Sequence, residues 1–88
     1  MLVNIEEIEA AGLDVKVVRS IARKLSNSAK EAEKHGIQIF GGSGSGSLRF
    51  NDSHEMGNLI IAHLDCYNWD GGDGGNCFDA DGLERGEF

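Results

Sequence analysis

The sequence lacks any hydrophobic run near the length of about 18 residues that a membrane-spanning helix needs. It also has no Lys or Arg among its first nine residues, which hold three acids, so the basic start of a secretory signal is missing. We therefore expect a soluble protein of the cytoplasm. A chain of 88 residues suffices for one small domain that buries roughly 60 to 65% of its unfolded surface.

Catalytic and metal-binding signatures are sparse. The four candidate zinc ligands are His54, His63, Cys66 and Cys77, but no C-x-x-C pair occurs and His63-x-x-Cys66 is only half a motif. Cys66, His63 and Asp65 also share a neighbourhood, yet residues at one strand end point in alternating directions and make a poor triad. We expect no enzyme activity, no metal site and no cofactor. Pairing of the two cysteines stays open, although a cytosolic location favours reduced thiols.

Charge is distributed unevenly along the chain. Residues 1–36 balance six acids against six bases, residues 37–64 contribute −1, and residues 65–88 contribute −6 from seven acids and one base, for the total of −7. This asymmetry suggests a surface directed at a cationic partner, and the alternative is an acidic solvated tail that keeps the protein soluble. The six bases are Lys16, Arg19, Arg23, Lys24, Lys30 and Lys34. Because the net charge repels a polyanion, we expect no direct nucleic-acid binding.

The first third of the chain predicts two helices. Asn4 is a good N-cap with Glu7 as its capping-box partner, so a short helix is expected over residues 5–11, ending at Gly12. Asp14 caps a second helix of about 21 residues, 15–35, which ends at Gly36. One apolar stripe of helical period runs along it, through Val18, Ile21, Ala22, Leu25, Ala29 and Ala32.

Three strands are expected next, at residues 37–40, 48–50 and 59–64, because these runs are rich in β-branched and aromatic residues. Their short connections predict an antiparallel meander, which gives an α+β fold of order ααβββ with the long helix packed on the sheet. The expected core is Val18, Ile21, Leu25, Ile39, Phe50, Leu59 and Ile61. The third run is apolar on both faces, which is typical of a central strand or one covered by a partner or the tail. Residues 1–64 form the expected helix-plus-meander core, and residues 65–88 form an acidic Gly/Asp-rich segment that is either part of the same single domain or a tail.

The segment Gly41 to Ser47, GGSGSGS, resembles a phosphate loop only in composition. No Lys and no helix follow it, so it fits neither nucleotide-binding motif. We interpret it as a flexible hairpin loop, and composition alone would also fit an artificial linker. Any ligand here would be an anion or a partner's loop held by backbone N–H groups.

Residues 70–84, DGGDGGNCFDADGLE, contain one nine-residue match to a calcium repeat at Gly71 to Asp79, with Asn76 in place of an Asp. A single repeat has no neighbour with which to share an ion. The EF-hand template fits less well, because its first position falls on Cys77 and its twelfth on Phe88. The alternative function is thus a divalent-cation or small-ligand module built on this segment, with Asp70, Asp73, Asn76, Asp79 and Asp81 as ligands. Solvated turns are the simpler interpretation.

In size, acidity and α+β layout the chain resembles the small accessory proteins of phages and mobile elements, including anti-CRISPR-like inhibitors. The resemblance carries no motif and assigns no residue. It implies a non-enzymatic protein that blocks a basic, nucleic-acid-binding surface of a larger host-defence protein or ribonucleoprotein. From the charges and interleaved aromatics we predict a partner-binding surface of Tyr67, Trp69, Asp70, Asp73, Asp79, Asp81 and Glu84. A monomer and a dimer are both compatible with it.

Overall fold

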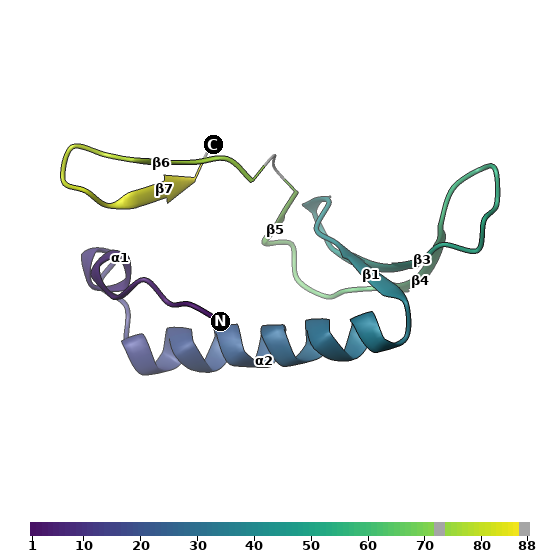
Figure 1. Cartoon of the computed structure of the whole chain (residues 1–88), viewed down its shortest axis with the longest axis horizontal. Coiled ribbons are helices and arrows are strands. Elements are labelled where there is room, and N and C mark those ends of the chain that lie inside the picture. The colour runs from purple at the N-terminus through teal and green to yellow at the C-terminus, as the bar shows by residue number, and fades with distance from the viewer. Residues whose placement is uncertain (72–73, 87–88) are drawn as a thin grey trace. The chain divides into compact units, whose positions relative to one another are not determined.

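A computed structural model describes residues 1–71 and 74–86. Two helices, α1 (Ile5–Ala10) and α2 (Val15–Lys34), precede a three-stranded antiparallel sheet of β1 (Ile37–Phe40), β3 (Ser47–Phe50) and β4 (Leu59–His63) (Figure 1). The sheet order β1-β3-β4 is that of a meander. The α+β fold class and the ααβββ order are therefore confirmed.

Two strand pairs are additional to the predicted fold. β2 (Ser43–Gly44) pairs with β5 (Trp69–Asp70), and β6 (Asn76–Phe78) forms a hairpin with β7 (Glu84–Gly86). The acidic segment thus contains a regular hairpin, whereas we predicted solvated turns without a strand. Its strands are only two or three residues long, too short for the period-2 pattern that identifies a strand from sequence.

The chain forms two compact units. The first combines Met1–Ser28 with Asp73–Phe88, and the second is Ala29–Gly72. Residues 65–71 thus belong to the unit that contains the meander, and residues 74–86 to the unit that contains α1. The predicted boundary between residues 64 and 65 therefore lies inside the second unit.

The helix ends follow local chemistry with one exception. Asp14 caps α2 through a 2.8 Å bond to the N–H of Lys16, and α1 ends in a Schellman motif in which Gly12 donates to Glu9 and Leu13 to Ile8. The capping box predicted for α1 is wrong. Asn4 makes no side-chain cap bond, and both of its predicted members bond to the β6–β7 hairpin instead.

The register of the three-stranded sheet defines two faces. β3 pairs along its length with β1 and with β4, and an irregularity between Leu48 and Arg49 leaves Ile61 of β4 without a partner in the register. Because side chains alternate along a strand, one face, here called the Ile39 face, carries Ile37, Ile39, Leu48, Phe50 and Leu59. The opposite face, here called the Arg49 face, carries Gln38, Phe40, Ser47, Arg49, Ile60 and His63.

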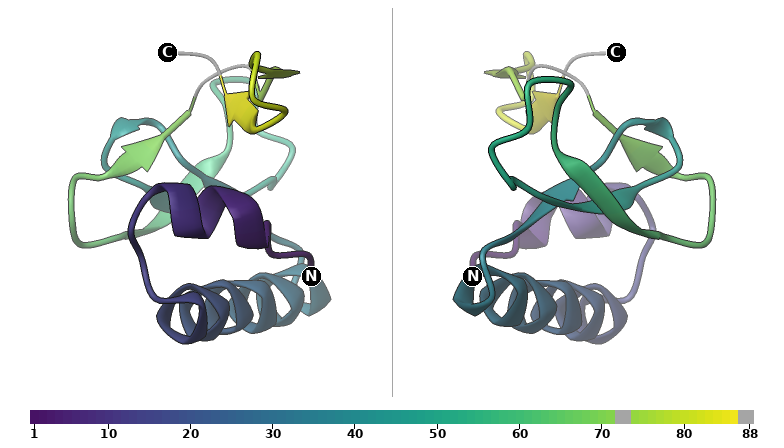
Figure 2. Two further views of the ribbon diagram at one scale, coloured as in Figure 1. Left: turned by 90° about the vertical axis from the view of Figure 1, so that its left-hand side faces the viewer. Right: turned by 90° about the vertical axis from the view of Figure 1, so that its right-hand side faces the viewer.

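The predicted core differs from the observed burial. Among the described residues, the buried hydrophobic residue is Ile8 of α1, at 7% exposure. Within the first unit α1 crosses the beginning of α2 (Figures 1 and 2). Val18 and Ala22 of α2 line the same pocket as Ile8. Val18 is half-buried. The other predicted core residues are between 38% and 53% exposed: Ile21, Leu25, Ile39, Phe50, Leu59 and Ile61. The stripe has the predicted period, but period alone does not say what covers it.

Neither helix in the described part of the chain has both the length and the apolar character required to cross a bilayer.

Candidate binding surfaces

The predicted partner-binding residues are divided between the two units. Tyr67, Trp69 and Asp70 belong to the second unit; Tyr67 is 87% exposed, and the indole Nε1 of Trp69 donates to the carbonyl of Asp65 at 3.3 Å. A further set, Asp79, Asp81 and Glu84, lies in the first unit. Asp73 lies outside the described residues. These residues therefore form two groups, one in each unit. Their role in binding stays a prediction.

In the first unit, Asp79 organises the turn of the β6–β7 hairpin. Its Oδ1 accepts the N–H groups of Asp81 at 2.9 Å and Leu83 at 3.1 Å, and its Oδ2 accepts Arg85 Nε at 2.5 Å. The bond from Arg85, and after it the bond from Leu83, holds the pKa of Asp79 below its usual value of 3.8. This carboxylate therefore stabilises the hairpin itself.

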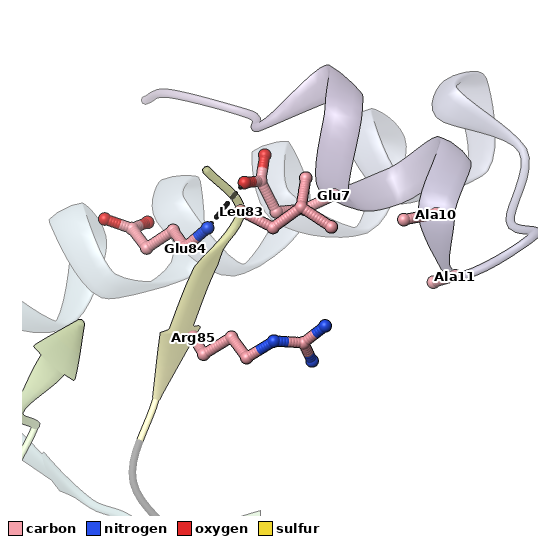
Figure 3. Close-up of a pocket in the computed structure, with 6 residues that line it drawn as sticks. All are labelled: Glu7, Ala10, Ala11, Leu83, Glu84 and Arg85. Carbon is pink, nitrogen blue, oxygen red and sulfur yellow. Dashed lines mark hydrogen bonds between the residues drawn. The ribbon is translucent and has the colours of Figure 1, made fainter. Parts of the chain in front are cut away.

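Glu84 joins the hairpin to α1. Its two carboxylate oxygens accept the side-chain amides of Asn4 at 2.8 Å and Asn76 at 2.9 Å, while its backbone N–H donates to Glu7 Oε2 at 2.8 Å. The bond to Glu7 lies at a pocket of about 290 Å³ (Figure 3), which Ala10, Ala11, Leu83 and Arg85 also line. Both oxygens of Glu84 already have donors, so this predicted binding residue also has a role within the fold.

Metal and thiol chemistry finds no support in the described residues. No three His, Cys, Asp or Glu side chains among them gather closely enough to hold a metal ion. Cys66 and Cys77 are exposed free thiols rather than a disulfide. Neither a zinc site nor a calcium site is therefore proposed.

Among the described residues, the bases of α2 form no ion pair with an acid. In the part of the chain that the structure describes, the ion pair within 4.0 Å is that of Arg85 with Asp79, at 2.5 Å. None of the six helix bases takes part in one.

The Gly/Ser segment has a defined conformation and belongs to the second unit. Ser43 pairs with Asp70 and Gly44 with Trp69, which ties the segment to β5. Gly42 has φ of +62°, and a Cβ on it would lie 2.7 Å from the carbonyl oxygen of Ser45. Gly46 is buried, and a Cβ there would lie 3.0 Å from the Trp69 ring. Gly42 therefore fills a position that suits only glycine, and a side chain at Gly46 would require the Trp69 ring to shift. The segment joins the antiparallel strands β1 and β3, as predicted for a hairpin loop, and its pairing with β5 is additional to that prediction.

A pocket of about 230 Å³ opens on the Arg49 face of the sheet, beside this segment. The Arg49 guanidinium stacks on the Phe40 ring at 3.9 Å from its centroid, and Arg49 Nε donates to Ser47 Oγ at 3.1 Å. Ser47 is 6% exposed, and His63 pairs with it across the strands. This pocket was not predicted from the sequence. The available signal was Arg49, the one base between residues 37 and 64, two positions after a Ser in a strand.

β4 forms one edge of the sheet, since its strand partner in the described chain is β3. Its residues Leu59, Ile60 and Ile61 are 50%, 50% and 46% exposed, and the strand contains no charged residue and no proline. Lysine, proline and inward-pointing charges are the usual protection of an edge strand. β4 is therefore an apolar strand whose outer edge is not paired with another described strand.

Comparisons of the chain with protein-family models, with curated proteins and with solved structures found no match.

Proposed function

We propose that this chain is a non-enzymatic protein-binding module whose partner pairs with the sheet along β4. The observation that carries the proposal is the conflict between sequence and position in this strand. Residues apolar on both faces are typical of a central strand or of one covered by a partner, whereas β4 lies at an edge of the sheet and pairs with β3 in the described chain. A strand added by the partner would supply the second neighbour and cover the exposed side chains.

The nature of the partner is inferred from charge. β4 is itself uncharged, and the segment that follows it in sequence, residues 65–88, carries −6. Such a segment attracts a basic protein surface and raises the association rate, whereas apolar contacts slow dissociation. The phage-type inhibitor of a basic host-defence surface, acting in the cytoplasm, remains our finer proposal for this partner.

The test compares two single substitutions of apolar, half-exposed residues by lysine. Ile61→Lys places a charge on the β4 edge, and Val17→Lys places the same charge on α2, where Val17 is 54% exposed. The partner is identified by cross-linking capture with the wild-type protein, and affinities are then measured with that purified partner. Thermal melts of both variants establish that each is folded.

We expect Ile61→Lys to weaken binding by about a hundredfold, because it introduces a desolvated charge into a strand pair. Val17→Lys should leave the affinity within about twofold. Equal affinity of wild type and Ile61→Lys would refute β4 as the interface, and loss of binding with Val17→Lys alone would place the interface on α2. Analytical ultracentrifugation of the wild type identifies the case in which the partner is a second copy.

A further inference from the structure

The pocket on the Arg49 face presents hydrogen-bond donors that have no acceptor among the described residues. Of its lining residues, Ser47, Arg49 and His63 carry the polar groups that matter here, and no Asp or Glu lines it. Arginine is always protonated and has donors only. Its Nε is bonded to Ser47, and the remaining N–H groups on its terminal nitrogens have no acceptor among the described residues.

The Ser47 hydroxyl adds a second, independent indication. A serine hydroxyl has one proton to donate and lone pairs to accept, and here the oxygen accepts Arg49 Nε–H. The proton is thus left to donate, and it has no acceptor in the described part of the chain. Ser47 as a residue is 6% exposed and lines the pocket, so a ligand in the pocket can accept the remaining hydroxyl proton.

The arginine is also held in place before any ligand arrives. The guanidinium carbon lies over the Phe40 ring, 3.9 Å from its centroid, and the bond from Nε to Ser47 adds a second restraint on the side chain. A planar fork held in this way matches two oxygens of one carboxylate or phosphate. Since the side chain need not be ordered upon binding, little conformational entropy is lost.

We propose that this pocket binds a small oxyanion, a carboxylate or a phosphate group, through the Arg49 guanidinium and the Ser47 hydroxyl, with His63 at its side. The two sources share the same acceptor chemistry, and the volume of about 230 Å³ accommodates either group. This site goes beyond the proposed function, because it lies on a face of the sheet rather than on the β4 edge and requires an anionic rather than a basic ligand.

The experiment is a titration of the full chain with inorganic phosphate and, separately, with acetate, at constant ionic strength held with chloride. Binding is followed by chemical shifts of backbone amides and of the Arg49 Nε–H group. We expect saturable shifts at about millimolar ligand, confined to the Gly42 to Arg49 region and His63. The ratio of the phosphate to the acetate dissociation constant tells which group the pocket prefers.

Three variants make the result specific. Arg49→Gln should weaken binding by about tenfold to a hundredfold, as expected for a charged hydrogen bond. Arg49→Lys keeps the charge but lacks the fork, so a loss of about tenfold distinguishes directed bonds from simple attraction. Arg19→Gln removes the same charge from exposed α2 and should change nothing.

The proposal is overturned if neither ion gives a saturable shift, if the shifts are as large on the α2 bases as at the pocket, or if Arg49→Gln binds as well as wild type. Melting temperatures of all three variants establish that they are folded. These outcomes are independent of Ile61→Lys and Val17→Lys, so this site and the β4 interface succeed or fail separately.

Discussion

The two compact units of this chain use their polar groups differently. In the first unit, Glu7 of α1 accepts a hydrogen bond from the β6–β7 hairpin, Glu84 of the hairpin accepts one from Asn4 at the start of α1, and Ile8 of α1 is buried. In the second unit, backbone hydrogen bonds hold the sheet, while apolar side chains remain half-exposed and donors of Arg49 and Ser47 have no acceptor among the described residues. Acidity along the sequence therefore does not by itself identify the binding surface, because two of the acids serve the fold.

The largest effect that would sharpen this comparison is expected at Ile8. Ile8→Ala removes a buried hydrophobic side chain and should lower the free energy of unfolding of the protein by about 2 to 5 kcal/mol. The comparison variant is Leu25→Ala, at a side chain that is 53% exposed, and it should lower the free energy of unfolding by less than half as much. Urea denaturation of both variants measures the difference. If Leu25→Ala were equally destabilising, the α2 stripe would be covered in solution.

The next effect concerns the second unit, where the backbone at Gly46 lies close to the Trp69 ring. In Gly46→Ala the new Cβ would lie 3.0 Å from Trp69 Cδ2 and 3.2 Å from Leu64 Cδ1. The indole must then shift, and we expect a loss of about 1 to 3 kcal/mol with altered Trp fluorescence. Ser45→Ala, an exposed change in the same segment, is the control. An unchanged melt and spectrum for Gly46→Ala would show that the Trp69 contact is dispensable.

A smaller loss is expected where α1 meets the hairpin. Glu7→Ala removes the acceptor of the Glu84 N–H, a partly buried bond, and should lower the unfolding free energy by about 1 to 2 kcal/mol. Hydrogen exchange at the Glu84 amide should accelerate at the same time. Glu6→Ala removes an exposed acid from the same helical turn and is the matched control. Equal behaviour of the two variants would indicate that the first unit does not depend on this bond.

Much of the fold followed from the sequence. The period of α2, the Asp14 cap and the β1, β3 and β4 runs are local signals, and the bounds of β1 were predicted without error. What failed depends on residues distant in sequence. Asn4 and Glu7 form an ordinary capping pattern, and only the arrival of Glu84, 77 positions after Glu7, gives them other partners.

The binding surfaces show the same division between local and distant information. The apolar character of β4 was predicted from its residues, but not its position at a sheet edge, which depends on the pairing of three strands. The pocket at Arg49 was missed because it is formed by side chains from β1, β3 and β4 together. Charge counting drew attention to Asp79 and Glu84 without revealing that each accepts bonds inside the first unit.

The smallest effect is expected from acid titration of the hairpin. Because the Arg85 and Leu83 bonds lower the pKa of Asp79, its charged form stabilises the folded state above the unfolded value of about 3.8. That stabilisation should be lost as pH falls through the folded pKa. We expect the Leu83 amide to lose hydrogen-exchange protection below that point, with little change between pH 5 and 7. Asp79→Asn should remove the step, whereas Asp81→Asn should preserve it, since the Asp81 side chain accepts no hydrogen bond from a described residue. A step that persists in Asp79→Asn would assign the pH dependence of the hairpin to another carboxyl group.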